Sequence, residues 1–423
     1  MKLTGIRSIE ELNKGTGENP ALFGKRVFIR VDFNCPLDKK TGQITDDARI
    51  REAIPTIKYA MDAGAKVILA SHLGRPKPGK HEGLSLEVCG AKLAELTNYE
   101  VLLPEDCVGD APKKVIHDLR AGQVCLLENL RFHEEEEADD ETFAKQLAEL
   151  CDVYVDDAFG CVHRAHASVH ALPRMMRERG MGMLLRKELE SLSKLVDRPA
   201  KPYVAVLGGA KVSDKIDVVE ALLNVVDTLA IGGAMANTFL AAQGKDMQKS
   251  RIEEDKLPLA RTILGKARDK NVEILLPVDL VVATALDADA GNIVAADRVL
   301  EGTMALDIGP KTIELFNKAI SKAKTVFWNG PMGLFETPAF SKGTFEVARA
   351  MSAAPGFTVV GGGDSASAVK IAGDGVAQGF KHISTGGGAS LELIEGKKLP
   401  GVEALRTNAP PGDERSSEKA PSR

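Results

Sequence analysis

The sequence predicts an α/β protein built from two doubly wound parallel sheets. Short apolar runs recur along the chain, and each ends in a polar or glycine-rich turn, as in RVFIRVDFN and PYVAVLGGAK. Amphipathic stretches such as IREAIPTIKYAMDAG lie between many of these runs. Short buried strands that alternate with helices are typical of an open parallel sheet covered on both faces. A chain of 423 residues is long enough for two or three such domains.

Composition and charge narrow the classes of function. Apolar residues make up 44% and charged residues 27% of the chain, which is typical of a soluble globular protein. The net charge of −5 gives no overall basic field, so we expect no nucleic-acid or membrane partner and only a local anion site. No secretory signal or membrane-length apolar run is evident. The six cysteines form no C-x-x-C pair, and we expect reduced, buried thiols in a cytoplasmic protein, with a redox or zinc role as the less favoured alternative.

The strand endings divide the chain into two parts. In open parallel sheets, ligands bind outside the carboxyl ends of the strands. Asp, Asn, His and Arg follow the strands before about residue 175, whereas Gly, Lys and Asp follow them after about residue 200. We therefore expect an anion-binding domain at 1–175, a linker helix and hinge at 176–202, and a nucleotide-binding domain at 203–394. Residues 407–423 are polar and proline-rich, which predicts a disordered tail.

Arginines are the main candidates for anion binding in the first domain. A guanidinium group binds carboxylate and phosphate through two parallel hydrogen bonds. Any one arginine is compatible with an ordinary surface charge, but several at one sheet edge would form a pocket. Asp32 and Asn34 end the first strand, where they would bind a hydroxyl group or orient the arginines. The acidic run at 134–141 predicts a solvated helix start. The arginines in or near strand endings are Arg30, Arg49, Arg51, Arg75, Arg131 and Arg164.

Three histidines have a spacing that allows two interpretations. His163, His166 and His170 follow the pattern H-x-x-H-x-x-x-H, which is compatible with a zinc site. Arg164 lies inside the same cluster, and its charge would repel a metal ion. We therefore favour one wall of an anion pocket, while a zinc site and ordinary core or surface histidines stay open as alternatives.

Glycine-rich turns follow the strands of the second domain, at 208–211, 361–365 and 386–390. Glycine lets the backbone approach a ligand closely, and amides at a helix N-terminus favour phosphate. No segment fits the P-loop pattern, and GGGDSA fits the dinucleotide pattern only loosely, because no acidic residue ends a strand about 20 residues later. Lys211 and Lys215 are four residues apart, which predicts two cations on one helical face for phosphate.

Nine segments, in this order, resemble the phosphoglycerate kinase family, and the resemblance covers roughly residues 3–405: VDFNCPLD, ITDDARI, SHLGRP, ENLRF, HRAHAS, LGGAKVSDKI, VFWNGPMGLFE, GGGDS and HISTGGGASLE. The resemblance implies two Rossmann-like domains that face each other across a cleft, in a monomeric enzyme. It implies reversible phosphoryl transfer between 1,3-bisphosphoglycerate and MgADP, giving 3-phosphoglycerate and MgATP after hinge closure. It also implies that residues near 395–406 pack back on the first domain.

The resemblance also implies roles for individual residues. Asp32 and Asn34 would lie at the glycerate hydroxyl, and the basic patch for phosphate and carboxylate would be Arg49, His72, Arg75, Arg131 and Arg164. Lys215 and the turn of Gly362, Gly363, Asp364 and Ser365 would bind the phosphates of the nucleotide. Glu336 would bind the ribose. The base would be lined by Gly232, Gly233 and Ala305. Asp364 would bind Mg²⁺.

The transfer needs no general base, because both nucleophiles are anions at pH 7. We expect Arg49 and Lys211 to stabilise the charge of the transferring group. Cys35, Cys161-Val162, Ala234 and Ala305 depart from the family's common residues, which bears on nucleotide affinity and thiol sensitivity rather than on the reaction. A kinase of another small phospho-acid and a non-catalytic anion-binding protein remain alternatives. A nicotinamide oxidoreductase is disfavoured by the missing acidic residue.

Overall fold

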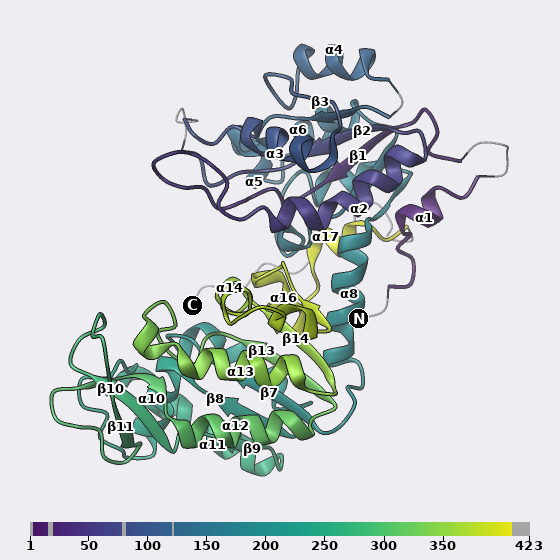
Figure 1. Cartoon of the computed structure of the whole chain (residues 1–423). Helices are drawn as coiled ribbons and strands as arrows, with labels where there is room; N and C mark the ends of the chain where they lie inside the picture. Colours follow the sequence, from purple (N-terminus) through teal and green to yellow (C-terminus); the bar gives the residue numbers. More distant parts are fainter. Residues whose placement is uncertain (1–2, 16–19, 78–81, 121, 408–423) are drawn as a thin grey trace, which may run out of the picture. The chain divides into compact units, whose positions relative to one another are not determined.

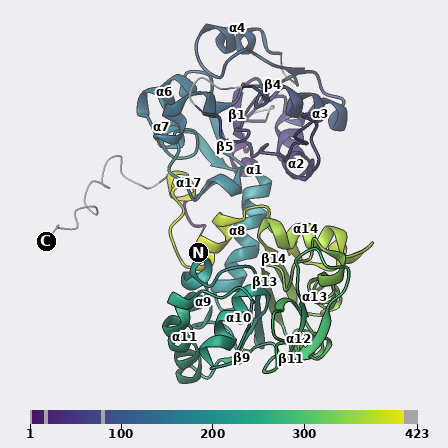
Figure 2. The same ribbon diagram turned by 90° about the vertical axis from the view of Figure 1, so that its left-hand side faces the viewer.

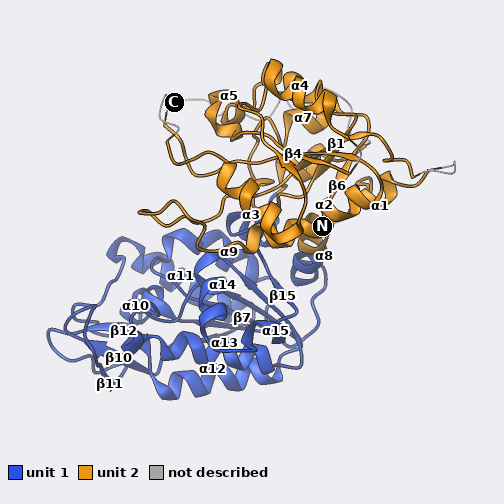
Figure 3. Ribbon diagram, turned by 45° about the horizontal axis from the view of Figure 1, so that its top comes forward, with its two compact units in different colours: residues 1, 190–397 blue, residues 2–189, 398–423 orange. Residues whose placement is uncertain are grey.

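The computed structural model describes residues 3–15, 20–77, 82–120 and 122–407, which divide into two compact units (Figure 1; Figure 3). The C-terminal unit is residues 190–397, and the N-terminal unit is the chain up to residue 189 together with the segment from residue 398 on. The boundary at 189/190 falls inside helix α8 (Met183–Val196). The predicted tail lies outside the described residues, except for Thr407.

The N-terminal unit is built on a six-stranded sheet in the order β3-β4-β2-β1-β5-β6, with every pair parallel. Its strands are β1 (Arg26–Arg30), β2 (Lys66–Ala70), β3 (Val101–Leu102), β4 (Val124–Leu126), β5 (Val153–Asp156) and β6 (Arg179–Met181). Its main helices are α1 (Ile9–Leu12), α2 (Ala48–Asp62), α3 (Glu87–Thr97), α4 (Asp110–Asp118), α5 (Glu134–Glu137), α6 (Glu141–Ala148), α7 (Ala171–Met175) and α17 (Pro400–Ala404). Helices α2 and α3 lie on one side of the sheet, and α6 and α7 on the other (Figure 2).

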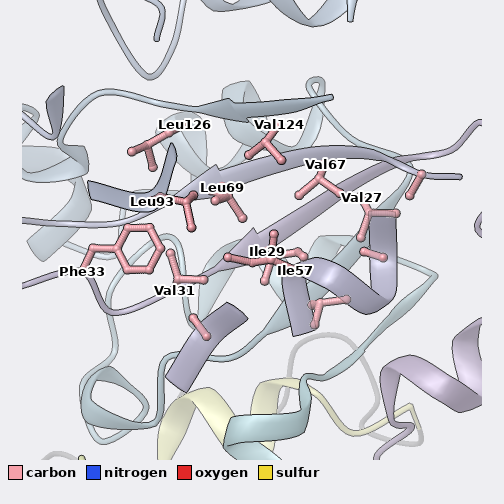
Figure 4. Packing of buried hydrophobic residues seen from close by; sticks show 14 of the residues in the cluster. Val27, Ile29, Val31, Phe33, Ile57, Val67, Leu69, Leu93, Val124 and Leu126 are labelled. Atoms are coloured by element: carbon pink, nitrogen blue, oxygen red, sulfur yellow. The ribbon is translucent and has the colours of Figure 1, made fainter. Parts of the chain in front are cut away.

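Both faces of this sheet are buried, because successive residues of a strand point to opposite sides. Val27 and Ile29 belong to a cluster with Ile57 of α2 (Figure 4). The alternate residue Phe28 is fully buried on the opposite face, where its ring stacks on Tyr154 with centroids 5.9 Å apart. This double burial explains why the strands appear in the sequence as continuous apolar runs rather than as alternating patterns.

The C-terminal segment of the chain packs on the N-terminal unit. The amide of Gly401 in α17 donates to the Val162 carbonyl at 2.9 Å, and a Cβ at Gly401 would lie 3.0 Å from Val162 Cα. The Arg179 guanidinium donates to the carbonyl of Arg406. The Thr407 amide donates to the Gly5 carbonyl at 3.0 Å. The two ends of the described chain are therefore fixed to the same unit.

The C-terminal unit repeats the architecture with a second six-stranded parallel sheet, in the order β15-β14-β13-β7-β8-β9. Its strands are β7 (Tyr203–Leu207), β8 (Thr228–Ile231), β9 (Glu273–Leu275), β13 (Thr325–Asn329), β14 (Phe357–Gly361) and β15 (His382–Ile383). A three-stranded antiparallel sheet adds β10 (Asp279–Ala283), β11 (Asn292–Ala295) and β12 (Met304–Ile308). Its helices are α9 (Ile216–Leu222), α10 (Gly233–Ala242), α11 (Leu257–Asp269), α12 (Pro310–Lys322), α13 (Lys342–Ala353), α14 (Gly363–Ile371), α15 (Val376–Gly379) and α16 (Gly388–Ile394).

Helices again cover both faces of the parallel sheet, with α9 and α11 on one side and α12 and α13 on the other (Figure 2). Trp328 of β13 is fully buried and belongs to one cluster with Phe316 of α12 and Val347 of α13. The predicted class of two doubly wound parallel sheets is confirmed. None of the described helices is both long enough and apolar enough to span a bilayer.

Candidate functional site

Polar side chains of the N-terminal unit gather where the parallel strands end. Asp32 and Asn34 follow β1, and His72 follows β2. Arg131 lies in the short 3₁₀ helix after β4, and Arg164 lies in the loop after β5. Because β1, β2, β4 and β5 are parallel neighbours, these loops emerge at one edge of the sheet.

Asp32 and Arg49 form a direct ion pair at this edge. Arg49 lies in the first turn of α2, and its guanidinium donates to the Asp32 carboxylate. Burial alone would raise the pKa of Asp32, but Arg49 and Arg30 hold that pKa below its usual range. A Cβ at Gly160 would lie 2.5 Å from Asp32 Oδ2, so the glycine leaves room for this carboxylate. Arg51, by contrast, is exposed and pairs with Asp47 at 2.8 Å.

Asn34 and Arg131 both hold the loop after β2. Asn34 Oδ1 accepts from the Gly74 amide at 2.8 Å, and Arg131 Nη1 donates to the Gly74 carbonyl at 2.8 Å. Arg131 Nε also pairs with Glu137 at 3.0 Å. The loop fixed in this way carries Arg75, which is exposed at the same edge.

His72 is buried beside Arg30, and its Nδ1 lies 3.2 Å from Arg30 Nη2. Burial, together with the charges of Arg30 and Arg131, lowers the pKa of His72 well below its ordinary value. The imidazole is therefore neutral at pH 7. Because a guanidinium can only donate, Nδ1 accepts and the ring proton lies on Nε2.

Arg30 is anchored by two residues that sequence analysis missed. Its Nε donates to Ser168 Oγ at 2.9 Å. Ser168 in turn donates its hydroxyl to Glu136 Oε1 at 2.6 Å and its amide to Glu136 Oε2 at 2.9 Å. Glu136 is fully buried, so the prediction that the run at 134–141 is solvated was wrong at this position. Four consecutive acids gave no periodic signal that one of them turns inward.

The three spaced histidines have separate partners. His163 Nε2 accepts from Arg164 Nε at 3.3 Å, whereas His170 Nδ1 lies 2.6 Å from Asp139 Oδ2. Burial, with the charges of Arg131, Arg30 and Arg164, lowers the pKa of His166 to about 4. Among the described residues, no candidate metal cluster contains any two of these histidines. This arrangement favours the wall of an anion site over zinc.

In the C-terminal unit, the two predicted lysines do not share a helical face. Lys211 is exposed and precedes the 3₁₀ turn Ser213–Lys215, so that prediction was wrong. The amide of Ser213 donates to Glu253 Oε2 at 3.1 Å, which replaces a helical partner there. Lys215 turns inward, and its Nζ donates to the carbonyl oxygens of Gly208 at 2.6 Å and Asn329 at 2.9 Å. Burial lowers the pKa of Lys215 to about 8.

Glycines let the turns after β7, β8 and β13 meet. Gly233 has φ +66°, and a Cβ there would lie 2.6 Å from the amide nitrogen of Gly209. Gly330 has φ +94°, and a Cβ there would lie 2.4 Å from Lys215 Nζ. Gly232 donates its amide to the Leu207 carbonyl at 2.8 Å. The predicted base-lining pair 232–233 therefore adjoins the turn that precedes Lys211.

The turn after β14 begins helix α14 at Gly363, with Gly362 at the N-cap. Ser365 is buried, and its Oγ accepts from the Gly330 amide at 2.6 Å. Asp364 is exposed in the first turn, and its negative charge opposes the lowering of the Lys215 pKa by burial. Mg²⁺ usually keeps several waters and takes one or two carboxylates besides phosphate oxygens, so an exposed Asp364 fits that ion.

Ala305 and Glu336 belong to adjoining segments. Ala305 lies in β12, and its amide donates to Ser250 Oγ at 2.9 Å. Glu336 is exposed in the loop after β13. This loop is tied to β12, because the Leu334 amide donates to the Leu306 carbonyl at 2.8 Å. Buried Asp307 was missed by sequence analysis; it accepts from the Gly343 amide at 2.7 Å, and burial raises its pKa to about 7.

Comparisons with known proteins agree over nearly the whole chain. The sequence model of a family described as phosphoglycerate kinase matches residues 18–397. The phosphoglycerate kinase of Anaeromyxobacter sp. (strain K) is 57% identical over 386 residues, which span 90% of this chain and 97% of the relative. That of Clostridium botulinum (strain 657 / Type Ba4) is 50% identical over 396 residues, 93% and 98% of the two chains.

Solved structures agree as well. The phosphoglycerate kinase of Coxiella burnetii has a TM-score of 0.82 at 39% identity and covers 95% of this chain and 98% of its own. That of Pyrococcus horikoshii OT3 has a TM-score of 0.77 at 34% identity, with coverage of 91% and 97%. The resemblance inferred from nine short segments is confirmed: the chain belongs to the phosphoglycerate kinase family.

Proposed function

We propose that the N-terminal unit binds 3-phosphoglycerate or 1,3-bisphosphoglycerate and that the C-terminal unit binds MgATP or MgADP. Membership of the family makes the chain a phosphotransferase with a carboxyl group as acceptor. The observation that carries the division of roles is the gathering of Arg49, Arg131 and Arg164 with neutral His72 at one sheet edge.

The charges at this edge favour a small dianion or trianion. Asp32 and Glu137 compensate Arg49 and Arg131 in part. The described hydrogen-bond partners of buried Arg30 include no carboxylate. Arg75 and Arg164 add further positive charge in the surrounding loops. A phosphate and a carboxylate on one small molecule would compensate this excess, while Asp32 and Asn34 would bind the hydroxyl group.

The C-terminal unit offers backbone amides instead of guanidinium groups. The amides at the start of α14, with Gly362, Gly363 and Ser365, would bind nucleotide phosphates, together with Lys215. Asp364 would hold Mg²⁺, which supplies positive charge between the phosphates when it is bound. Glu336 would bind the ribose hydroxyls, and Gly232, Gly233 and Ala305 would line the base.

Phosphoryl transfer then depends on positioning and on charge. The acceptor carboxylate is already ionised, so this chain needs no residue to remove a proton. Arg49 from one unit and Lys211 from the other would stabilise the transferring group. Residues 176–202, which contain α8 and the boundary between the units, would act as the hinge that brings the two ligands together across a cleft.

A coupled assay tests the proposal with a matched pair of variants. MgATP and 3-phosphoglycerate are supplied, and product formation is followed as NADH oxidation by a dehydrogenase. Arg49→Ala should lower turnover by about 10²–10³-fold. Arg51→Ala is the control, because Arg51 lies on the same helix but is exposed and paired with Asp47. Absence of product with well-folded protein, or equal losses in both variants, would contradict the assignment.

We also propose that the chain acts as a monomer in the cytoplasm, with no nucleic-acid or membrane partner. The net charge of −5 supports the absence of polyanion binding. Size-exclusion chromatography with light scattering should give a single species near 45.2 kDa. A species of twice that mass, or recovery of the protein with membranes after cell fractionation, would contradict this part of the proposal.

A further inference from the structure

Asp106, Cys107 and His133 form a second cluster at the edge of the N-terminal sheet, outside the site described above. Asp106 and Cys107 follow β3, and His133 follows the 3₁₀ helix after β4. Strands β3 and β4 are parallel neighbours, so both loops leave the sheet at its carboxyl edge. One carboxylate oxygen, one sulfur and one imidazole nitrogen of these residues all lie within 4.8 Å of one another.

The ligand groups are held close together by contacts with one another and with neighbouring residues. His133 Nε2 lies 2.7 Å from Asp106 Oδ1, and the His133 ring stacks on Phe143 with centroids 5.2 Å apart. The Cys107 amide donates to Asp106 Oδ1 at 2.6 Å, which fixes the carboxylate beside the thiol. The Cys107 side chain is buried, whereas Asp106 and His133 are 46% and 27% exposed, so an ion can approach from solvent.

Negative charge lies near the Cys107 thiol. Burial raises the pKa of this thiol well above its usual value, and the charges of Asp106 and the buried Glu136 raise it further. The other cluster of the same composition among the described residues, Asp32 with His72 and Cys161, has the opposite environment.

In the cluster of Asp32, His72 and Cys161, the guanidinium group of Arg30 already lies beside two of the donors. Arg30 Nη2 lies 3.2 Å from His72 Nδ1 and 3.7 Å from Cys161 Sγ. Arg49 donates to Asp32. A cation would be repelled there but attracted to the cluster at Asp106, so the two sites should differ in metal affinity.

We propose that Asp106, Cys107 and His133 bind a zinc ion. One thiolate, one imidazole and one carboxylate are donors that Zn²⁺ takes, and three protein ligands leave a fourth position for water. On binding, the Cys107 thiol releases its proton to solvent as the Zn–S bond forms. The proton that His133 donates to Asp106 leaves Nε2, and the ring keeps one proton on Nδ1, so that the Nε2 lone pair and the Asp106 carboxylate both bind the ion. Mg²⁺ would not compete, because it prefers oxygen ligands.

Cobalt substitution tests the site directly. Protein freed of metal by chelation is titrated with Co²⁺ in the absence of nucleotide, and thiolate-to-cobalt charge transfer and tetrahedral d–d absorption are recorded. We expect one equivalent of Co²⁺ to produce both bands and one equivalent of Zn²⁺ to remove them. Cys107→Ser should abolish the charge-transfer band, and His133→Gln should weaken Zn²⁺ binding by more than about 100-fold, since even outer-shell partners contribute 10- to 100-fold.

Two control variants locate the signal. His117→Gln removes another histidine that contacts a carboxylate, with Nδ1 3.0 Å from Asp118 Oδ1. Cys161→Ser removes the thiol of the cationic cluster. Both should keep the cobalt bands. Circular dichroism shows whether Cys107→Ser is folded; if it is not, the partly exposed His133→Gln decides. A wild-type protein without a charge-transfer band, or a band lost in Cys161→Ser but retained in Cys107→Ser, would overturn the proposal.

Discussion

Ser168→Ala is the substitution that best tests how the anion site is built. The Ser168 hydroxyl accepts from Arg30 Nε at 2.9 Å and donates to Glu136 Oε1 at 2.6 Å. All three residues are buried, with exposed fractions of at most 1%. Alanine removes both of these hydrogen bonds but keeps the hydrogen bond from the backbone amide of residue 168 to Glu136. The change therefore isolates the side-chain link between a buried cation and a buried anion.

The magnitude follows from the two bonds. A hydrogen bond to a charged group contributes about 1.5–3 kcal/mol, so two such bonds sum to about 3–6 kcal/mol. A water molecule that enters the small space left by the hydroxyl would recover part of this. We expect the free energy of unfolding of the N-terminal unit to fall by about 2–4 kcal/mol. For a domain of this size that corresponds to a melting temperature lower by roughly 4–16 °C.

The same change should weaken binding of the acid substrate. Arg30 contacts His72, so a reoriented Arg30 disturbs the neutral imidazole at the sheet edge. If this disturbance weakens the binding free energy of 3-phosphoglycerate by about 1.4 kcal/mol, the KM for 3-phosphoglycerate rises about tenfold. The KM for MgATP should not change, because the residues proposed to bind the nucleotide lie in the other unit.

The assay combines melting curves with coupled kinetics, and Ser390→Ala is its matched control. Ser390 is also fully buried, but its hydroxyl contacts Ser384 Oγ at 2.6 Å and no charged group. It should cost only about 0.5–1.5 kcal/mol and leave the KM for 3-phosphoglycerate unchanged. If Ser168→Ala melted like wild type with the same KM, Arg30 would be oriented by other groups and the argument would fail.

Three further outcomes are expected. Lys211→Ala should reduce turnover by about 10²–10³-fold and leave the affinity for 3-phosphoglycerate, measured by calorimetry, nearly intact; a large loss of that affinity would refute the separation of roles. Asp364→Asn should raise the Mg²⁺ concentration for half-maximal activity by at least about tenfold in a Mg²⁺ titration, and an unchanged curve would exclude Asp364 as the ligand. Burial raises the pKa of Asp157 to about 7, so the folded state binds this proton more tightly than the unfolded state. The resulting stabilisation of the folded state is full below about pH 4 and is lost as the pH rises to about 7. At about 1.4 kcal/mol per pH unit the loss is at most about 4 kcal/mol, so Asp157→Asn should melt higher than wild type at pH 8 and not at pH 4; a difference that is independent of pH would contradict the assignment.

The sequence predicts the parallel sheets well because their strands are buried on both faces. Runs such as YVAVL in β7 are apolar throughout and end at glycine, which gives a strong local signal. Strands β10 to β12 form a separate antiparallel sheet, and β11 is largely exposed, so its sequence lacks that signal. The turn after Lys211 is held by the hydrogen bond from Ser213 to Glu253, a contact over 40 residues that no local pattern contains.

The residues of the anion site were predictable by type but not by partner. Arg49, Arg131 and Asp32 were predicted for this site because they lie in or near strand endings, where ligands bind in parallel sheets. Glu136 and Ser168 were not predicted, because their role is to hold Arg30 through hydrogen bonds. Arg30 lies in a strand, and only the fold shows that its side chain is buried. Periodicity distinguishes buried from exposed apolar residues, whereas a buried ion network is defined by which loops meet.

The two units use charge differently, and this difference supports the proposal that they bind different ligands. In the N-terminal unit, formal charges are buried as a network, with Arg30 compensated through Ser168 by Glu136 and His72 kept neutral. In the C-terminal unit, Lys215 is held by two carbonyl oxygens. Backbone dipoles thus hold that cation, while in the described part of the chain the N-terminal amides of α14 donate no hydrogen bond to a capping side chain. On the proposed assignment, a small acid with two charged groups needs fixed guanidinium partners. Mg²⁺ offsets only part of the negative charge of a nucleotide, and helix-terminal amides with Lys211 and Lys215 would compensate the remainder.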